Sequence, residues 1–190
     1  ISGDISFEHD FLNSHSKIKG YAFDGTIDVS TIEKHKGLTL VQKNISSENT
    51  ETTENLSNYL STHKDIFLKM DIEGAEYPWI LSSDFTNVKQ MAIEFHVWGG
   101  AAVPSLWNCL KRIDQTHCII HIHVNNNQSL LCIDSLYVPE VFEVTFLRKH
   151  EFKNGFKIDL SEIPAIIDMP NDPSKEDVKL VGYPYTRMHK

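Results

Sequence analysis

An abrupt change from apolar to acidic residues near the middle of the chain constrains the fold more than any other feature of the sequence. The short, largely apolar run at residues 66–70 is followed directly by the acidic block DIEGAE at residues 71–76. Strands of open α/β sheets end in this way when polar side chains lie at the carboxyl edge, where such sheets bind ligands. Gly74 allows the backbone to turn sharply there. We therefore predict a ligand site immediately after residue 70.

The composition limits the partners that the chain can have. Its 190 residues, 41% of them hydrophobic, suit one globular domain with a sizeable core. The net charge of −8 disfavours a nucleic-acid partner, because polyanions select basic surfaces. The three cysteines show no C-x-x-C spacing, which indicates reduced thiols in a cytoplasmic protein. No apolar stretch approaches the length of a membrane span.

Apolar periodicity and turn residues predict an alternation of helices and strands. The predicted helices cover residues 4–12, 29–35, 53–63, 76–81 and 104–116. The predicted strands cover residues 17–23, 38–42, 66–70, 88–97, 118–124 and 138–147. This order favours an α/β fold with a doubly wound, mostly parallel sheet.

The two ends of the chain differ from this regular middle. We expect residues 1–149 to form the α/β domain and the proline-containing residues 150–190 to form a loop-rich extension packed on it. The chain begins at Ile1 with no strand before residues 2–4, so we expect the first strand of the sheet to be missing.

Acidic residues that close predicted strands are the first candidates for ligand binding. Asp24 follows an apolar strand and precedes Gly25, so its carboxylate could accept both hydroxyl protons of a ribose, or could cap an Asx-type turn. Asp71 could orient a substrate and Glu73 could take a proton from it. Either could instead cap the following helix, whose N-terminal dipole favours anions. We assign Glu76 to that cap or to a salt bridge.

Alternating polar residues predict a polar face on the sheet. Glu94 and His96 share one face of their strand, and His121 and His123 share one face of theirs. Because both faces of a doubly wound sheet are normally apolar, a polar face near the strand ends indicates a site. His96 is the preferred general base, since an imidazole changes charge near neutral pH. The alternative is a hydrogen-bonded core histidine.

The acidic block also carries a family resemblance. Residues 69–76, KMDIEGAE, resemble the signature of FkbM-like methyltransferases, class I enzymes that use S-adenosylmethionine and typically methylate oxygen. Further stretches resemble the same family in the same order, at residues 2–8, 21–26, 43–46, 92–96, 121–126 and 139–145. The resemblance implies a Rossmann-like class I fold whose late strand is antiparallel.

The resemblance implies roles for individual residues. The implied cofactor-binding residues, from the end of the first cofactor loop to the ribose, adenine and sulfur positions, are Gly3, Asp4, Asp24, Gly25, Asn44 and Asp71. The implied catalytic residues are Asp71, Glu73, Glu94, His96 and His123. We expect Gly3, Asp24 and Asp71 to line one cleft, with Glu73, His96 and His123 on the side of the methyl acceptor. The implied acceptor is a hydroxyl of a small molecule or glycan, and Trp98 lies where a loop covering it would start.

Two other classes of function remain open. Gly3 is the only glycine left of the first cofactor loop, which favours a non-catalytic binding or scaffolding domain of the same fold. A metal-dependent hydrolase is the third hypothesis, because Asp71, His96 and His123 could converge on a divalent metal ion. No metal-binding motif supports that ion directly.

Overall fold

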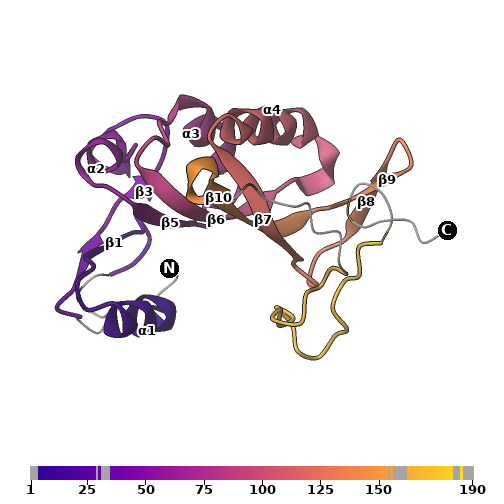
Figure 1. Cartoon of the computed structure of the whole chain (residues 1–190), viewed down its shortest axis with the longest axis horizontal. Helices are drawn as coiled ribbons and strands as arrows, with labels where there is room; N and C mark the ends of the chain where they lie inside the picture. The colour runs from indigo at the N-terminus through magenta and orange to yellow at the C-terminus, as the bar shows by residue number, and fades with distance from the viewer. Residues whose placement is uncertain are drawn as a thin grey trace. The chain divides into compact units, whose positions relative to one another are not determined.

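The computed structural model describes residues 4–28, 30, 35–153, 155, 162–181 and 185. The chain divides into two compact units, Ile1–Leu56 and Ser57–Lys190 (Figure 1). Both combine helices with strands, so the predicted α/β class is confirmed. Within the described ranges, no helix is long and apolar enough to cross a membrane. The helix predicted at residues 29–35 lies largely outside the described residues.

The described residues of the first unit form one helix and two pairs of parallel strands: α1 (Ser6–Ser14), β1 (Gly20–Phe23) with β2 (Leu38–Val41), and β3 (Asn44–Ile45) with β4 (Thr53–Glu54). Leu12 of α1 packs at the start of β1, where a Cβ on Gly20 would lie 3.2 Å from the leucine side chain. Ile5 and Ile27 form a small core with side chains of β2. Because β1 and β2 are parallel, their carboxyl ends lie at one edge.

The second unit is built on a four-stranded mixed sheet in the order β5-β6-β10-β7. Its strands are β5 (Ile66–Met70), β6 (Val88–His96), β10 (Val141–Arg148) and β7 (His117–Val124). β5 runs parallel to β6, whereas β10 runs antiparallel to both of its neighbours. The antiparallel direction predicted for residues 138–147 is therefore confirmed, although the strand begins only at Val141.

The described strands are distributed over several sheets rather than one. β1 and β2 pair with each other in the first unit, and the central sheet of the second unit is mixed. The structure thus shows an α/β fold with a mixed central sheet. The described strands do not show the doubly wound, mostly parallel sheet expected from the sequence.

Two helices cover one face of the central sheet. α3 (Glu76–Ser82) and α4 (Val103–Asp114) pack side by side along it, whereas the short α2 (Ser57–Thr62) precedes β5 (Figure 1). The ring of Phe95 lies between that of Tyr77 on α3, at 6.2 Å, and that of Phe142 on β10, at 5.7 Å. Burying each such Phe contributes roughly 1.5–3 kcal/mol. This layer is the main core of the second unit.

The opposite face of the sheet is polar, as the alternation predicted. The register aligns Glu94, Glu143 and His123 in one row across β6, β10 and β7. Neighbouring strands are about 4.8 Å apart, so His123 lies roughly 10 Å from Glu94. The two residues share a face but belong to different parts of it.

A hairpin that the sequence did not predict precedes β10. β8 (Leu130–Ile133) pairs antiparallel with β9 (Leu136–Pro139), and the two residues between them, Asp134 and Ser135, both have positive φ. Two-residue hairpin loops favour this backbone conformation, because its twist matches that of the strands. The single strand predicted at residues 138–147 is therefore divided between β9 and β10.

Candidate functional site

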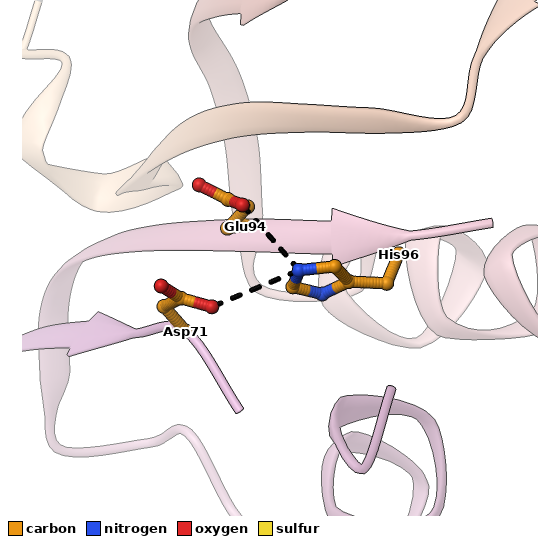
Figure 2. A group of neighbouring side chains, drawn as sticks. All are labelled: Asp71, Glu94 and His96. Carbon is orange, nitrogen blue, oxygen red and sulfur yellow. Dashed lines mark ion pairs between the residues drawn. The ribbon is translucent and has the colours of Figure 1, made fainter. Parts of the chain in front are cut away.

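The carboxyl ends of β5 and β6 bring together an acidic and histidine-containing cluster. Met70, the last residue of β5, pairs with Ile93 of β6, so Asp71 comes next to Glu94. His96 is the last residue of β6. Because β5 and β6 are parallel, their polar ends lie at the same sheet edge. Figure 2 shows the side chains of Asp71 and Glu94 pointing toward the imidazole of His96.

Three carboxylates face one nitrogen of this imidazole. His96 Nε2 lies 3.4 Å from Glu94 Oε1 and 3.8 Å from Asp71 Oδ1 (Figure 2), and it lies 3.5 Å from Glu73 Oε2. All three distances exceed the usual 2.7–3.2 Å of an N–H···O hydrogen bond. The His96 side chain is only 3% exposed, whereas that of Glu73 is 73% exposed. The cluster therefore has a buried centre and an open acidic rim.

Glu76 fixes the orientation of the imidazole from behind. Its side chain is fully buried, and Oε1 lies 3.1 Å from His96 Nδ1 while accepting a 2.8 Å hydrogen bond from the His96 backbone N–H. Glu76 Oε2 accepts a hydrogen bond from the Gly74 N–H at 2.8 Å. The Tyr77 hydroxyl donates to the His96 carbonyl. The start of α3 thus holds both the turn after β5 and the end of β6.

The turn between β5 and α3 points Glu73 outward. Glu73 and Gly74 both have positive φ, 54° and 95°. Positive φ is uncommon for a residue other than glycine, so Glu73 is held in a strained conformation. Trp98 packs over this turn, since a Cβ on Gly74 would lie 3.2 Å from its ring.

The charges of the cluster shift the pKa values of two members. Burial alone would lower the pKa of His96, but its close contacts with Glu76 and Glu94 and the charges of Glu76 and Glu73 raise it to about 10. Burial, followed by the nearby charge of Glu94, raises the pKa of Asp71. The imidazole and the carboxylates of the cluster therefore titrate as one coupled set.

The first unit gathers three of the predicted cofactor-binding residues. Asp24 follows β1, and its Oδ1 accepts hydrogen bonds from the backbone N–H and the hydroxyl of Thr26, at 2.7 and 2.6 Å. The Gly25 N–H donates to Asn44 Oδ1 at 3.0 Å, and a Cβ on Gly25 would lie 2.6 Å from that oxygen. The turn is therefore an acidic strand end where a side chain at position 25 would displace that of Asn44, which suits a ribose-binding position. Asp4 accepts the Ser6 N–H at the start of α1.

Other predicted residues lie apart from the cluster. His123 Nε2 pairs with Asp177 at 3.0 Å, so the structure does not bring it to Asp71. Gly3 is outside the described residues. The cleft predicted from Gly3, Asp24 and Asp71 involves residues of both units and stays a prediction.

The sequence assigned Glu76 to a cap or a salt bridge, and the structure gives it an ion pair with His96, a partner that the sequence did not indicate. The position at the start of α3 was right, but its main partner is His96, twenty residues further on. No local spacing encodes that contact. The apolar residues Tyr77 and Trp79, which follow Glu76 and are buried with it, are a sequence signal that could have indicated an inward-facing carboxylate.

Acidic and imidazole side chains at the carboxyl ends of parallel strands, in an α/β domain, define the class of proteins that bind a cofactor or substrate at a sheet edge. The chain matches the family described as Methyltransferase FkbM domain over residues 1–112, more than half of its length. It therefore belongs to the FkbM methyltransferase family, which confirms the resemblance. No curated protein and no solved structure gives a significant match.

Proposed function

We propose that the protein transfers a methyl group from S-adenosylmethionine to a hydroxyl of a small molecule or glycan. One observation carries this proposal: the cluster of Asp71, Glu94 and His96 lies at the ends of two parallel strands and inside the region that matches the methyltransferase family. The class I fold, with its doubly wound sheet, and the separate extension at residues 150–190 are part of the same proposal.

The first unit supplies the cofactor-binding residues of this proposal. Asp24 binds the ribose hydroxyls, Gly25 lets the backbone approach them, and Asn44 lies toward the adenine, while Gly3 and Asp4 belong to the loop beside them. Two hydrogen bonds from Thr26 to Oδ1 hold the Asp24 carboxylate in place at the end of β1. The bound cofactor supplies a methyl group on a positively charged sulfur.

The cluster of the second unit handles the acceptor. Methyl transfer breaks the S–CH₃ bond and forms an O–CH₃ bond, so the hydroxyl must give up its proton to the protein. Glu73 and His96 are the two candidates for the group that receives this proton, and Asp71 and Glu94 orient the hydroxyl. The raised pKa of His96 keeps its imidazole protonated near neutral pH, so His96 can receive the proton only in its deprotonated form. Proton removal of this kind contributes roughly 10²–10⁴-fold to the rate. Glu73→Gln and His96→Ala, compared at constant cofactor affinity, identify which group acts.

Calorimetry with S-adenosylhomocysteine tests the proposal directly. The chain, together with any residues that precede it in its parent protein, should bind this product, and Asp24→Asn should weaken binding at least tenfold. Asp84→Asn is a matched control, because Asp84 makes the same two hydrogen bonds to Thr86, at 2.9 and 2.6 Å, away from any strand end. No binding by the folded wild type would support the non-catalytic alternative instead.

A further inference from the structure

The three side chains of Figure 2 are spaced like the ligands of one metal ion. One ligand atom from each of Asp71, Glu94 and His96 lies within 4.8 Å of the others. Around a divalent ion with bonds of roughly 2.1 Å, neighbouring ligand atoms are about 3.0–3.4 Å apart. His96 Nε2 is already 3.4 Å from Glu94 Oε1 and 3.8 Å from Asp71 Oδ1. The Asp71 side chain is 46% exposed, so a small rotation brings it to ligand spacing.

His96 is oriented as metal-binding histidines are. With Nδ1–H donating to the buried Glu76 carboxylate, Nε2 is the ring nitrogen that faces Asp71 and Glu94, and a metal ion bound there takes the place of the Nε2 proton. Histidine ligands commonly donate their second ring N–H to a carboxylate, which fixes the ring and increases its basicity. Glu76 is itself held by the backbone N–H groups of Gly74 and His96. This support is built from a different element than the ligands.

The charge balance of the cluster also favours a cation. Four carboxylates surround one imidazole: those of Asp71, Glu73, Glu76 and Glu94. The imidazole and Lys69, whose charge acts on Asp71, do not balance four negative charges, and an uncompensated charge in a partly buried site is unfavourable. A divalent ion among them offsets most of this excess.

We propose that Asp71, Glu94 and His96 bind one divalent transition-metal ion, with Glu76 as the positioning residue behind His96. One imidazole and two carboxylates suit Mn²⁺ or Zn²⁺. Mg²⁺ and Ca²⁺ prefer sites in which all ligands are oxygen atoms. Three protein ligands leave coordination positions open for oxygen atoms of a second molecule.

The role of this ion rests on the proposed methyl transfer, whereas the metal site itself does not. An acceptor hydroxyl at an open position of the ion loses its proton more easily. With Nε2 of His96 bound to the metal, the exposed Glu73, 3.5 Å from that nitrogen, is the carboxylate that receives the proton. With the ion bound, the two residues therefore have different roles: His96 binds the ion and Glu73 accepts the proton.

Electron paramagnetic resonance of Mn²⁺ added to the purified protein, without cofactor, tests the site. The wild type should bind one ion per chain, and pulsed spectra should show coupling to one imidazole ¹⁴N. Glu94→Gln should weaken binding at least tenfold, and His96→Ala should also remove the nitrogen coupling. Glu76→Gln should weaken binding by roughly 10–100-fold while one-ion stoichiometry and the nitrogen coupling remain.

Glu143→Gln is the matched control. Glu143 is exposed on the same face and pairs directly with Glu94 in the register, but it is not a ligand. Removing its charge should change Mn²⁺ affinity only a few-fold. Circular dichroism verifies that each variant is folded. Glu94→Gln preserves the core, because Glu94 is only partly buried and glutamine has a similar size. No Mn²⁺ binding by the wild type, no nitrogen coupling, or equal weakening by Glu143→Gln and Glu94→Gln would overturn the proposal. Binding of S-adenosylhomocysteine needs no metal, so the two proposals fail independently.

Discussion

Single residues in the turn after β5 combine backbone strain with contacts to the candidate site. Glu73 has a φ of 54° and Gly74 a φ of 95°, and the Gly74 N–H is satisfied by Glu76. Strain of this kind costs of order 1–3 kcal/mol and persists only where surrounding contacts fix it. The turn trades stability for an outward-facing Glu73 beside His96.

Gly74→Ala is expected to destabilise the protein by roughly 1–3 kcal/mol. The φ of 95° disfavours any side chain, and the new Cβ would press on the Trp98 ring at 3.2 Å. Gly99→Ala is the control, because Gly99 has a φ of 64° but meets no heavy atom of the described chain within 4 Å. Urea unfolding should show the larger loss for Gly74→Ala. Equal losses would mean that the Trp98 contact contributes nothing.

At the scale of elements, the 3₁₀ turn η1 (Trp98–Gly100) carries an aromatic side chain beside the cluster. The Trp98 side chain is 48% exposed, and its ring centroid lies 4.9 Å from that of His96. An exposed aromatic face beside the candidate site suits stacking of a ring of the proposed methyl acceptor.

Trp98→Ala is expected to raise the KM for the acceptor by about two- to tenfold, because stacking contributes roughly 0.5–1.5 kcal/mol. The affinity for S-adenosylhomocysteine should stay unchanged. Trp107→Ala is the matched control, since Trp107 is also exposed but lies on α4 beside Lys111. Steady-state kinetics with calorimetry separate the two effects. A loss of cofactor affinity in Trp98→Ala would contradict an acceptor role.

The C-terminal segment at residues 162–181 is attached to β7 by two histidine–aspartate pairs. His121 Nε2 lies 2.6 Å from Asp168, and His123 Nε2 lies 3.0 Å from Asp177. Asn126, immediately after β7, adds hydrogen bonds to both the N–H and the carbonyl of Asp172. The predicted polar face of β7 thus holds a distant segment in place.

Replacing both Asp168 and Asp177 by Asn should make this segment more accessible to protease. Each pair links partly buried groups, and hydrogen bonds to charged partners contribute roughly 1.5–3 kcal/mol. Limited proteolysis followed by mass spectrometry should therefore show faster cleavage within residues 162–181. Glu176→Gln is the control, because Glu176 lies in the same segment and is exposed; this variant should be cleaved like the wild type. Unchanged cleavage of the double variant would show that other contacts hold the segment.

The elements that the sequence predicted well are those whose signal is local. β5 was predicted with its observed bounds, Ile66–Met70, because its apolar run ends at a carboxylate. The helix predicted at residues 53–63 instead begins at Ser57, since Thr53 and Glu54 pair with β3. The partners of His121 and His123 lie 47 and 54 residues further on, in a segment with no regular pattern. Contacts of this kind depend on tertiary packing, which periodicity cannot encode.

At the scale of the whole molecule, the family match includes the candidate site but not all the strands that support it. The match spans residues 1–112 and stops within α4, so β7 and β10 lie beyond it. These two strands nevertheless complete the sheet whose edge carries Glu94 and His96. The stability of the site therefore depends on strands that the family match does not include.

His117, at the start of β7, is a buried link between these strands and β6. Its Nε2 lies 3.0 Å from the carbonyl of Val88, and its Nδ1 lies 2.7 Å from the Thr116 hydroxyl. Burial lowers the pKa of His117, and the positive charges of Arg148, His150 and Lys149 act in the same direction. The folded protein therefore keeps this imidazole neutral at pH values where the unfolded chain protonates it.

This difference predicts that stability falls as pH drops below about 6.5, the ordinary histidine pKa. The unfolded state then binds a proton that the folded state does not, so His117 costs at most about 1.4 kcal/mol per pH unit until its folded pKa is reached. Above pH 6.5 neither state is protonated and the contribution is complete. Urea unfolding of the wild type and of His117→Gln between pH 5 and 8 measures it, because the other titrating groups cancel in the difference. The variant should lose less stability than the wild type on acidification, and parallel curves would show that His117 does not titrate differently in the two states.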